Sequence, residues 1–202
     1  MKQLLIGCGH SRVKRLGWPM PKWDREWDDL YTLDFNVDVA PDILCNLNSI
    51  WHTESSGKRW RAESDRKECV ERDIDGVEFL RDDFFDEVHA YEVLEHLGRQ
   101  GDFVSFFDTF SNLYRILVDG GLVIATVPSR FSGWLWGDPG HTRAILPEHL
   151  SFLDQTVYAK ECGKTTRSDY RFIWKCDFET LVSHDDKATH AFILKAHKPA
   201  RE

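Results

Sequence analysis

The chain has 202 residues, 42% hydrophobic and 13% aromatic, which is enough to bury a sizeable core within a single domain. Its 26 basic and 34 acidic residues give a formal net charge of −8, so nucleic acid is not an expected partner. Five cysteines without a C-x-x-C pair argue against a disulfide framework and a structural zinc site. No apolar stretch has the roughly 18 residues of a membrane span or the pattern of a signal peptide, so we expect a cytoplasmic protein without membrane contacts.

Apolar runs rich in Val, Ile, Leu and Phe recur along the chain and predict about seven strands. Several of these runs lack polar alternation, which is typical of a parallel sheet that is covered on both faces. The predicted strands lie at residues 3–8, 30–35, 42–47, 84–93, 121–128, 170–179 and 189–198.

Segments with helical periodicity lie between some of these strands. The apolar residues of "GDFVSFFDTFSNLYRIL" recur with the i, i+3, i+4, i+7 spacing, which predicts a helix that Gly120 and Gly121 end. A second helix is predicted to begin at Pro147 and to end at Gly163. Strands that alternate with helices indicate an α/β sheet.

Two segments depart from this alternation. Residues 48–82 are strongly charged with interleaved signs, which favours a surface insertion with a polar, solvated helix around residues 58–73. Residues 129–146 contain glycines, a proline and two tryptophans without a period, which predicts a loop over the carboxyl ends of the strands, where α/β folds place ligands. Trp134 and Trp136 either stack on a ligand ring or cover apolar core, and we favour the second.

The first predicted strand runs into a Gly-Cys-Gly turn, "LLIGCGHSR". Glycines let the backbone approach a ligand closely and adopt turn conformations that other residues resist. A dinucleotide site would need a third glycine where Arg12 stands and a substantial helix after it. A nicotinamide-dependent enzyme is therefore the weaker interpretation.

Asp34 ends the second predicted strand, "YTLD". A carboxylate at this position can hold the two hydroxyls of a ribose, which favours a nucleoside-like ligand. A purely structural turn between Asp34 and Asn36 stays open as the alternative.

Five motifs in succession resemble those of the class I S-adenosylmethionine-dependent methyltransferases, most closely the small-molecule type. The resemblance extends over residues 3–155 apart from the charged insertion. It implies a Rossmann-like three-layer sandwich, with a mostly parallel seven-stranded sheet and an antiparallel last strand, and S-adenosylmethionine as cofactor. Together with the length of the chain, it favours a single domain over 1–202 that carries the charged insertion. The motifs are "LLIGCGHSR", "LDFNVDVAPDILCNL", "FDEVHAYEVLEHL", "LYRILVDGGLVIATVP" and "HTRAILPEHLSFL".

Carried over by position, the resemblance implies a donor site at successive strand ends. The glycine turn would lie beside the methionine part of the donor, Asp34 would bind its ribose, and Asn46 would lie beside its adenine. Tyr91 and Glu92 would lie beside both the donor and the acceptor. The implied cofactor-binding residues are Gly7, Cys8, Gly9, Asp34, Phe35, Asn46, Leu47, Tyr91 and Glu92.

The chain departs from the family at two positions of the first of these motifs. Leu5 stands where the family commonly has an acidic residue, and Ser11 replaces the third glycine. The helices after the first and second strands are also expected to be short. A catalytically inactive binding or scaffold protein with this fold therefore stays open as a second hypothesis.

Methyl transfer from a sulfonium needs donor and acceptor held in line, and it needs a base only when the acceptor loses a proton. The candidate bases are His96 in "LEHL" and His141 in "GDPGHTR", although a structural role for either stays open. Glu95 is expected either to support its turn or to contact a ligand. We predict no metal site, because a pair of His141 and His149 lacks a third ligand.

The sequence excludes two classes of methyl acceptor but does not identify the acceptor. The D-P-P-Y-type and P-C signatures of DNA adenine and cytosine methyltransferases are absent from the sequence. A small-molecule acceptor is favoured, a sugar or a protein side chain also fits, and we expect a monomer.

Overall fold

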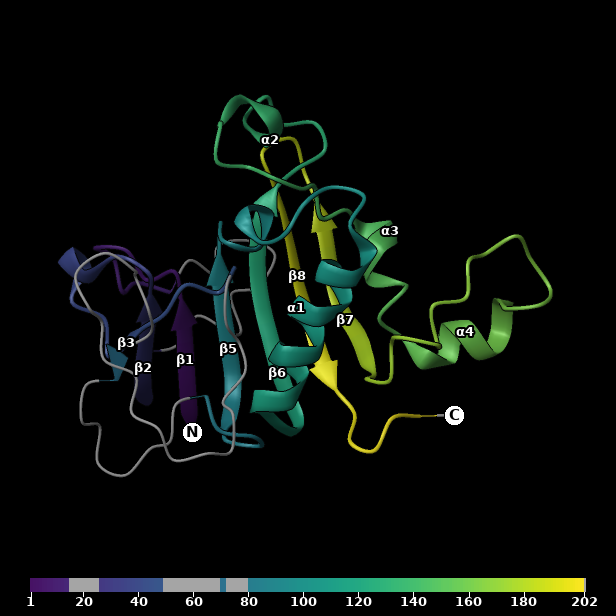
Figure 1. The fold of residues 1–202 in the computed structure, drawn as a ribbon, viewed down its shortest axis with the longest axis horizontal. Coiled ribbons are helices and arrows are strands. Elements are labelled where there is room, and N and C mark those ends of the chain that lie inside the picture. Colours follow the sequence, from purple (N-terminus) through teal and green to yellow (C-terminus); the bar gives the residue numbers. More distant parts are fainter. Residues whose placement is uncertain (15–25, 49–69, 72–79, 202) are drawn as a thin grey trace.

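The computed structural model describes residues 1–14, 26–48, 70–71 and 80–201. Its centre is an eight-stranded sheet in the order β4-β3-β2-β1-β5-β6-β8-β7 (Figure 1). The strands are β1 (Lys2–Ile6), β2 (Asp29–Asp34), β3 (Ile43–Leu44), β4 (Val70–Glu71), β5 (Phe85–Tyr91), β6 (Leu117–Pro128), β7 (Phe178–Asp185) and β8 (Thr189–Ala196).

The strand directions follow the pattern that the resemblance implies. β1 pairs in parallel with β2 and β5, and these in turn pair in parallel with β3 and β6. β8 is antiparallel to both β6 and β7. The predicted Rossmann-like α/β fold, with a mostly parallel sheet and an antiparallel last strand, is confirmed. The two-residue β4, antiparallel to β3, is an additional strand that the sequence analysis did not predict.

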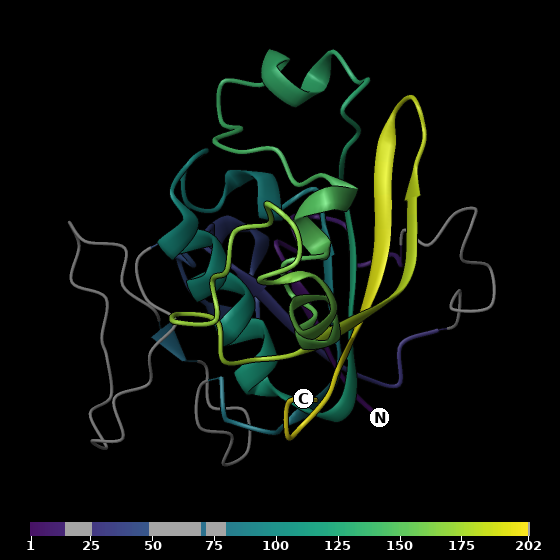
Figure 2. The ribbon, with the colours of Figure 1, turned by 90° about the vertical axis from the view of Figure 1, so that its right-hand side faces the viewer.

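The two faces of the sheet carry separate hydrophobic clusters. Leu4 and Ile6 of β1 join the larger cluster with apolar residues of helix α1 (Phe103–Ile116), whereas Leu5 joins a smaller one. This division follows from the two-residue period of a strand. Figure 2 shows α1 lying against one face of the sheet.

Helix α1 confirms the strongest helical pattern, but it does not end where the glycines predict. Asp102 caps its first turn by accepting a hydrogen bond from the Ser105 N–H at 3.1 Å. The helix ends at Ile116, and the next residue already belongs to β6, so Gly120 and Gly121 lie within a strand. A shift in the β5–β6 register absorbs the extra residues at this point.

The helix predicted from Pro147 to Gly163 is two short helices, α3 (Pro147–Leu150) and α4 (Gln155–Glu161). Asp154 interrupts it by capping α4 through the Thr156 N–H at 2.8 Å. The Leu153 carbonyl also leaves the helical pattern, because it accepts hydrogen bonds from the Phe178 N–H and the Trp174 indole. Hydrogen bonds to the segment around Trp174 and Phe178 thus replace the ones that a continuous helix would form here. The remaining helical segments are α2 (Trp134–Gly137) and the 3₁₀ turns η2 (Val37–Val39) and η3 (Leu94–His96).

The prediction of a strand at 170–179 is wrong except for its last two residues, which belong to β7. The Tyr170 carbonyl accepts hydrogen bonds from the N–H groups of Ile173 and Trp174, which makes a turn, and β7 begins only at Phe178. The apolar run arises instead from a fully buried Trp174.

The charged insertion lies largely outside the described residues. The polar helix expected at 58–73 lies outside them except for residues 70–71, which form β4 rather than a helix. In the described part of the chain, the structure contains no helix long and apolar enough to cross a membrane.

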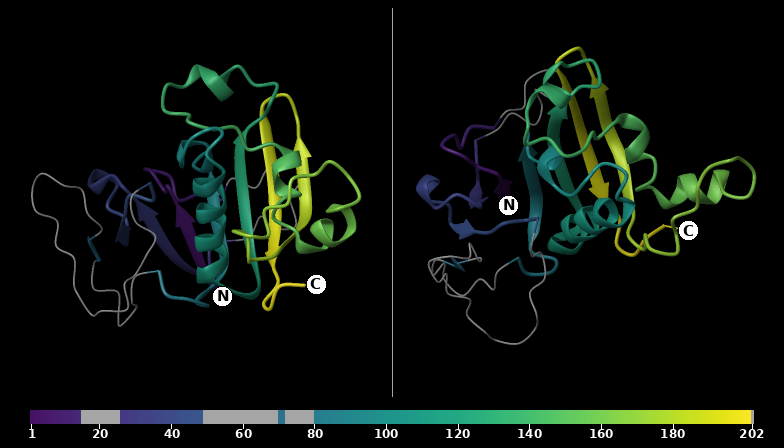
Figure 3. Two further views of the ribbon diagram at one scale, coloured as in Figure 1. Left: turned by 45° about the vertical axis from the view of Figure 1, so that its right-hand side comes forward. Right: turned by 45° about the horizontal axis from the view of Figure 1, so that its top comes forward.

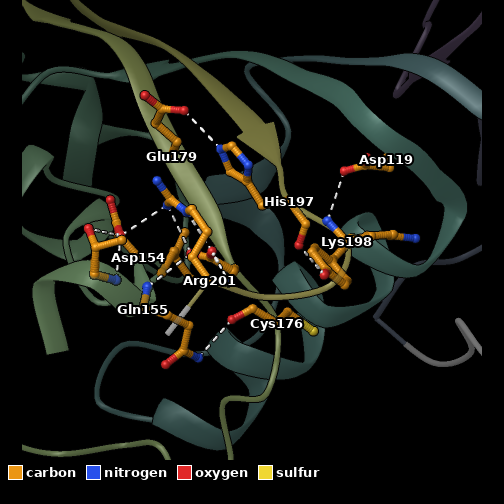
Figure 4. Close-up of polar contacts among 12 residues, drawn as sticks. Asp119, Asp154, Gln155, Cys176, Glu179, His197, Lys198 and Arg201 are labelled. Carbon is orange, nitrogen blue, oxygen red and sulfur yellow. Dashed lines mark hydrogen bonds and ion pairs between the residues drawn. The ribbon is translucent and has the colours of Figure 1, made fainter. Parts of the chain in front are cut away.

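Charged groups anchor the C-terminal segment to the β7 edge (Figure 4). The Arg201 guanidinium donates to the buried carboxylate of Asp177 at 2.7 and 3.0 Å and to Asp154 at 3.0 Å. Beside it, the Nε2 of His197 lies 2.8 Å from a carboxylate oxygen of Glu179. Burial by itself raises the pKa of Asp177, but the hydrogen bonds from Arg201 and from the Gln155 N–H outweigh this and leave that pKa lowered. Asp177 is therefore a buried anion that depends on Arg201.

Arg201→Ala is expected to lower the free energy of unfolding by about 3 kcal/mol, because it leaves the Asp177 carboxylate buried without its cation. Because the pKa of Asp177 is lower in the folded than in the unfolded protein, its ionisation stabilises the fold fully above the unfolded pKa of about 3.9. This stabilisation is lost as the pH falls through the pKa that Asp177 has in the folded protein. The difference between the variant and the wild type should therefore shrink below about pH 4, which urea unfolding at pH 7 and pH 3 measures.

The matched control is Arg171→Ala, which removes an exposed ion pair with Asp169. Such a pair contributes at most about 1 kcal/mol. Equal losses in the two variants would contradict the role given to Asp177.

Candidate functional site

The glycine turn connects the end of β1 to two neighbouring segments. Gly7 and Gly9 both have positive φ, +62° and +52°, a conformation that suits glycine. The Gly7 N–H donates to the Leu33 carbonyl at 2.7 Å. A Cβ on Gly7 would lie 2.4 Å from Cγ2 of Val93, so the turn also lies directly against the segment after β5.

Asp34 lies at the point where three strand ends meet. Its buried carboxylate accepts hydrogen bonds at 2.9 Å from the Gly9 N–H and, through the other oxygen, from the Asn36 N–H. Its carbonyl accepts the Cys45 N–H at 2.8 Å. The turn with Asn36 is therefore present, and the same carboxylate holds the glycine turn. Each carboxylate oxygen can accept more than one hydrogen bond, so ribose binding stays a prediction that this arrangement permits.

The residues predicted beside the donor differ in exposure. Cys8 and Leu47 are buried, and Phe35 has 60% of its surface exposed. Burial raises the pKa of the Cys8 thiol, and the Asp34 carboxylate adds to this rise. The Asn46 side-chain oxygen accepts the Asn48 N–H at 3.1 Å. Phe35 thus offers the largest accessible apolar surface of the predicted donor residues.

Tyr91 belongs to a buried hydrogen-bonded chain that sequence reasoning missed. Its hydroxyl lies 2.7 Å from Nδ1 of His89, and Nε2 of His89 lies 2.9 Å from Glu87. Because a carboxylate only accepts, Nε2 of His89 carries the hydrogen and Nδ1 accepts the Tyr91 hydroxyl. The polar residues at every second position of β5 were the signal that could have revealed this chain. Glu92 follows in the left-handed region with φ of +56°.

The two predicted catalytic histidines lie side by side. His96 ends η3 and His141 lies in the loop after α2, yet their ring centroids are 4.6 Å apart. Nδ1 of His96 lies 2.9 Å from the Gly140 carbonyl, and Nδ1 of His141 lies 3.2 Å from the Leu135 carbonyl. The structure thus brings together both predicted residues, whose catalytic roles stay predictions.

Glu95 completes this group. Its side chain is fully buried, and neither carboxylate oxygen has a hydrogen-bond partner. Burial raises the pKa of Glu95 to about 8, and the nearby carboxylates of Glu92 and Asp138 add to this rise. The oxygen Oε1 lies 3.8 Å from Nε2 of His141. The local pattern "LEHL" does not indicate that Glu95 is buried, so the sequence allows either a turn-supporting or a ligand-contacting role.

The backbone of the 129–146 loop docks on η3. The Glu95 carbonyl accepts hydrogen bonds from the N–H groups of Thr142 and Arg143 at 2.9 and 3.1 Å. The Arg143 guanidinium in turn donates to the carbonyls of Arg99 and Asp102. The loop is therefore held in place by backbone contacts as well as by the histidine pair.

The tip of this loop extends beyond the ends of β6 and β8 (Figures 1 and 3). Trp134 and Trp136 lie there with 73% and 59% of their surfaces exposed, so the expectation that they cover apolar core is wrong. Leu135 between them is the residue that packs inward. Stacking on a ligand ring, which the sequence offered as the less favoured alternative, stays open.

Comparisons with known proteins give only distant matches. No protein-family model matches the sequence, and no curated protein matches it. Among solved structures, an S-adenosylmethionine-dependent methyltransferase from Archaeoglobus fulgidus is similar with a TM-score of 0.47 and 17% identity, over 96% of this chain and 85% of the other. One from Methanosarcina mazei has a TM-score of 0.47 and 13% identity, over 97% and 92% of the two chains. An N-methyltransferase from Bradyrhizobium japonicum, in complex with S-adenosyl-L-homocysteine, has a TM-score of 0.43 and 16% identity, over 97% and 78%.

The identification of the fold rests on the topology itself. The central strands run in the order β3-β2-β1-β5-β6-β8-β7, with a glycine turn after β1 and an antiparallel β8. By this arrangement, the chain has the fold of the class I S-adenosylmethionine-dependent methyltransferases.

Proposed function

We propose that the protein binds S-adenosylmethionine and transfers its methyl group to a small-molecule acceptor. The observation that carries this proposal is the Asp34 carboxylate, which joins the glycine turn of β1 to the end of β2 at the carboxyl edge of the parallel strands. Ligands of open α/β sheets bind at this edge. A cytoplasmic location, a monomeric state and a single domain stay predictions from the sequence.

The donor is proposed to lie along the strand ends. Its methionine part would lie over the exposed backbone of Gly7, and its ribose hydroxyls would bind Asp34. The adenine would lie near Asn46 and Leu47, where the exposed ring of Phe35 can cover an apolar face. These placements use residues that follow β1, β2 and β3.

The acceptor is proposed to approach from η3 and the 129–146 loop. Val93 lies against the glycine turn, so the adjoining η3 with His96, and His141 beside it from the loop after α2, are next to the proposed donor position. The sulfonium already carries an activated methyl group, so holding the two reactants in line supplies most of the catalysis. Trp134 and Trp136 supply exposed rings for an acceptor.

A binding or scaffold protein with this fold is the second candidate, and Leu5 favours it. Its side chain is 2% exposed within β1, where the family commonly places a carboxylate for the donor's amino group. Detection of a methylated product after incubation with the donor and candidate acceptors separates an enzyme from a protein that only binds.

Isothermal titration calorimetry with S-adenosylmethionine and S-adenosyl-L-homocysteine should show binding of both. Asp34→Ala should weaken binding by about 1–3 kcal/mol, the range for a lost hydrogen-bonding partner, or roughly fivefold to 150-fold in Kd. Asp38→Ala, which removes an exposed carboxylate on η2, is the matched control and should bind as the wild type does. An absence of heat with both ligands would refute the enzyme hypothesis.

Gly7→Ala should destabilise the protein more than Gly9→Ala. Both substitutions place a Cβ in the left-handed region at about 1–2 kcal/mol, but only the Gly7 Cβ would collide with Val93, which adds the roughly 1–3 kcal/mol of an overpacked contact. Urea unfolding of the two variants measures the difference. Equal losses would show that Val93 moves aside without cost and that the turn is not tightly packed.

A further inference from the structure

We propose that Glu95, His96 and His141 bind a divalent first-row transition-metal ion beyond the carboxyl ends of β5 and β6. One ligand atom from each residue lies within 4.8 Å of the others, and no other such group is found among the residues that the structure describes. The ligands come from two segments, η3 and the loop after α2. Only the fold brings them together.

The histidine tautomers are the first observation that supports a metal. In both His96 and His141, Nδ1 faces a backbone carbonyl, which only accepts hydrogen bonds. Nδ1 therefore carries the hydrogen, and Nε2 keeps its lone pair for a ligand. Histidines that bind metals are oriented in this way, with the other ring nitrogen donating to a carbonyl or carboxylate.

The Glu95 carboxylate is the second and independent observation. Both of its oxygens are buried without a hydrogen-bond partner, although burying an unpaired polar group costs free energy. One oxygen lies 3.8 Å from the Nε2 atom of His141. A cation between them would supply the partner that the carboxylate lacks.

The donor set indicates the class of ion. Two imidazole nitrogens with one carboxylate oxygen suit zinc, iron and their neighbours, whereas magnesium prefers oxygen ligands alone. Ligand atoms around a tetrahedral zinc ion lie roughly 3.4 Å apart, given bonds of about 2.1 Å. The present spacing thus needs only small rotamer changes to close on an ion. Three protein ligands leave at least one coordination position open for water or for an oxygen-bearing ligand.

Metal binding replaces the general-base role predicted for the two histidines, because an imidazole whose Nε2 binds an ion has no lone pair left to take a proton. It also differs from the prediction of no metal site, which considered His141 only with His149. His149 instead accepts the Leu146 N–H through its Nδ1 at 3.1 Å. The proposal does not depend on donor binding, since the ion has its own ligands.

The test is titration of the untagged, metal-free full chain with Co²⁺ and Zn²⁺, followed by Co²⁺ ligand-field absorption and by calorimetry. We expect one ion per chain, a visible Co²⁺ spectrum typical of nitrogen and oxygen ligation, and a higher melting temperature with Zn²⁺. Mg²⁺ at the same concentration should raise the melting temperature far less.

The variants Glu95→Gln, His96→Ala and His141→Ala should each weaken binding by about 100-fold or more, since loss of a mere supporting residue already costs roughly 10- to 100-fold. His184→Ala removes a histidine of β7 outside the cluster and should bind as the wild type does. Glu95→Gln keeps the shape of the side chain, and its melting temperature without metal checks that it folds.

Two results would overturn the proposal. The first is that neither Co²⁺ nor Zn²⁺ binds the wild type at one ion per chain. The second is that Glu95→Gln, folded as the wild type, binds Zn²⁺ with unchanged affinity. Neither result bears on S-adenosylmethionine binding, which calorimetry with that ligand measures separately.

Discussion

The hydrogen bond from the Gly9 N–H to the Asp34 carboxylate is the contact on which the geometry of the proposed site depends. Asp34, at the end of β2, binds the turn after β1 through its carboxylate. Its backbone carbonyl accepts a hydrogen bond from the N–H of Cys45, the first residue after β3. Three neighbouring strands therefore end at one buried residue. A ligand that lies across these ends meets backbone in fixed positions, which lowers the entropy cost of binding.

A different constraint operates at η3. The fold buries the Glu95 carboxyl group without a hydrogen-bond partner and fixes the loop beside it through the Glu95 carbonyl. A local cost of this kind is typical of functional sites, where the rest of the fold stabilises an arrangement that is locally unfavourable. The neighbouring histidines, each held by a backbone carbonyl, show that the arrangement is built from several parts of the chain.

The two regions adjoin one another through Val93, which lies against Gly7 and precedes η3. A donor over the glycine turn and an ion at Glu95 would therefore occupy adjacent positions at the carboxyl ends of the parallel strands β1 and β5. Leu5 stands in β1 where the family commonly has an acidic residue, so the amino group of a donor bound as proposed would lack that partner.

Local patterns in the sequence determined the strand-forming runs, helix α1, the glycine turn and the position of Asp34, because these depend on side-chain period and on backbone preferences. Tertiary structure alone decided where α1 ends and where β7 begins, since both depend on pairing with distant strands and on the burial of Trp174. It also decided the group of Glu95, His96 and His141. His96 and His141 belong to segments that follow different strands, and they meet only because β5 and β6 are parallel neighbours whose carboxyl ends lie together.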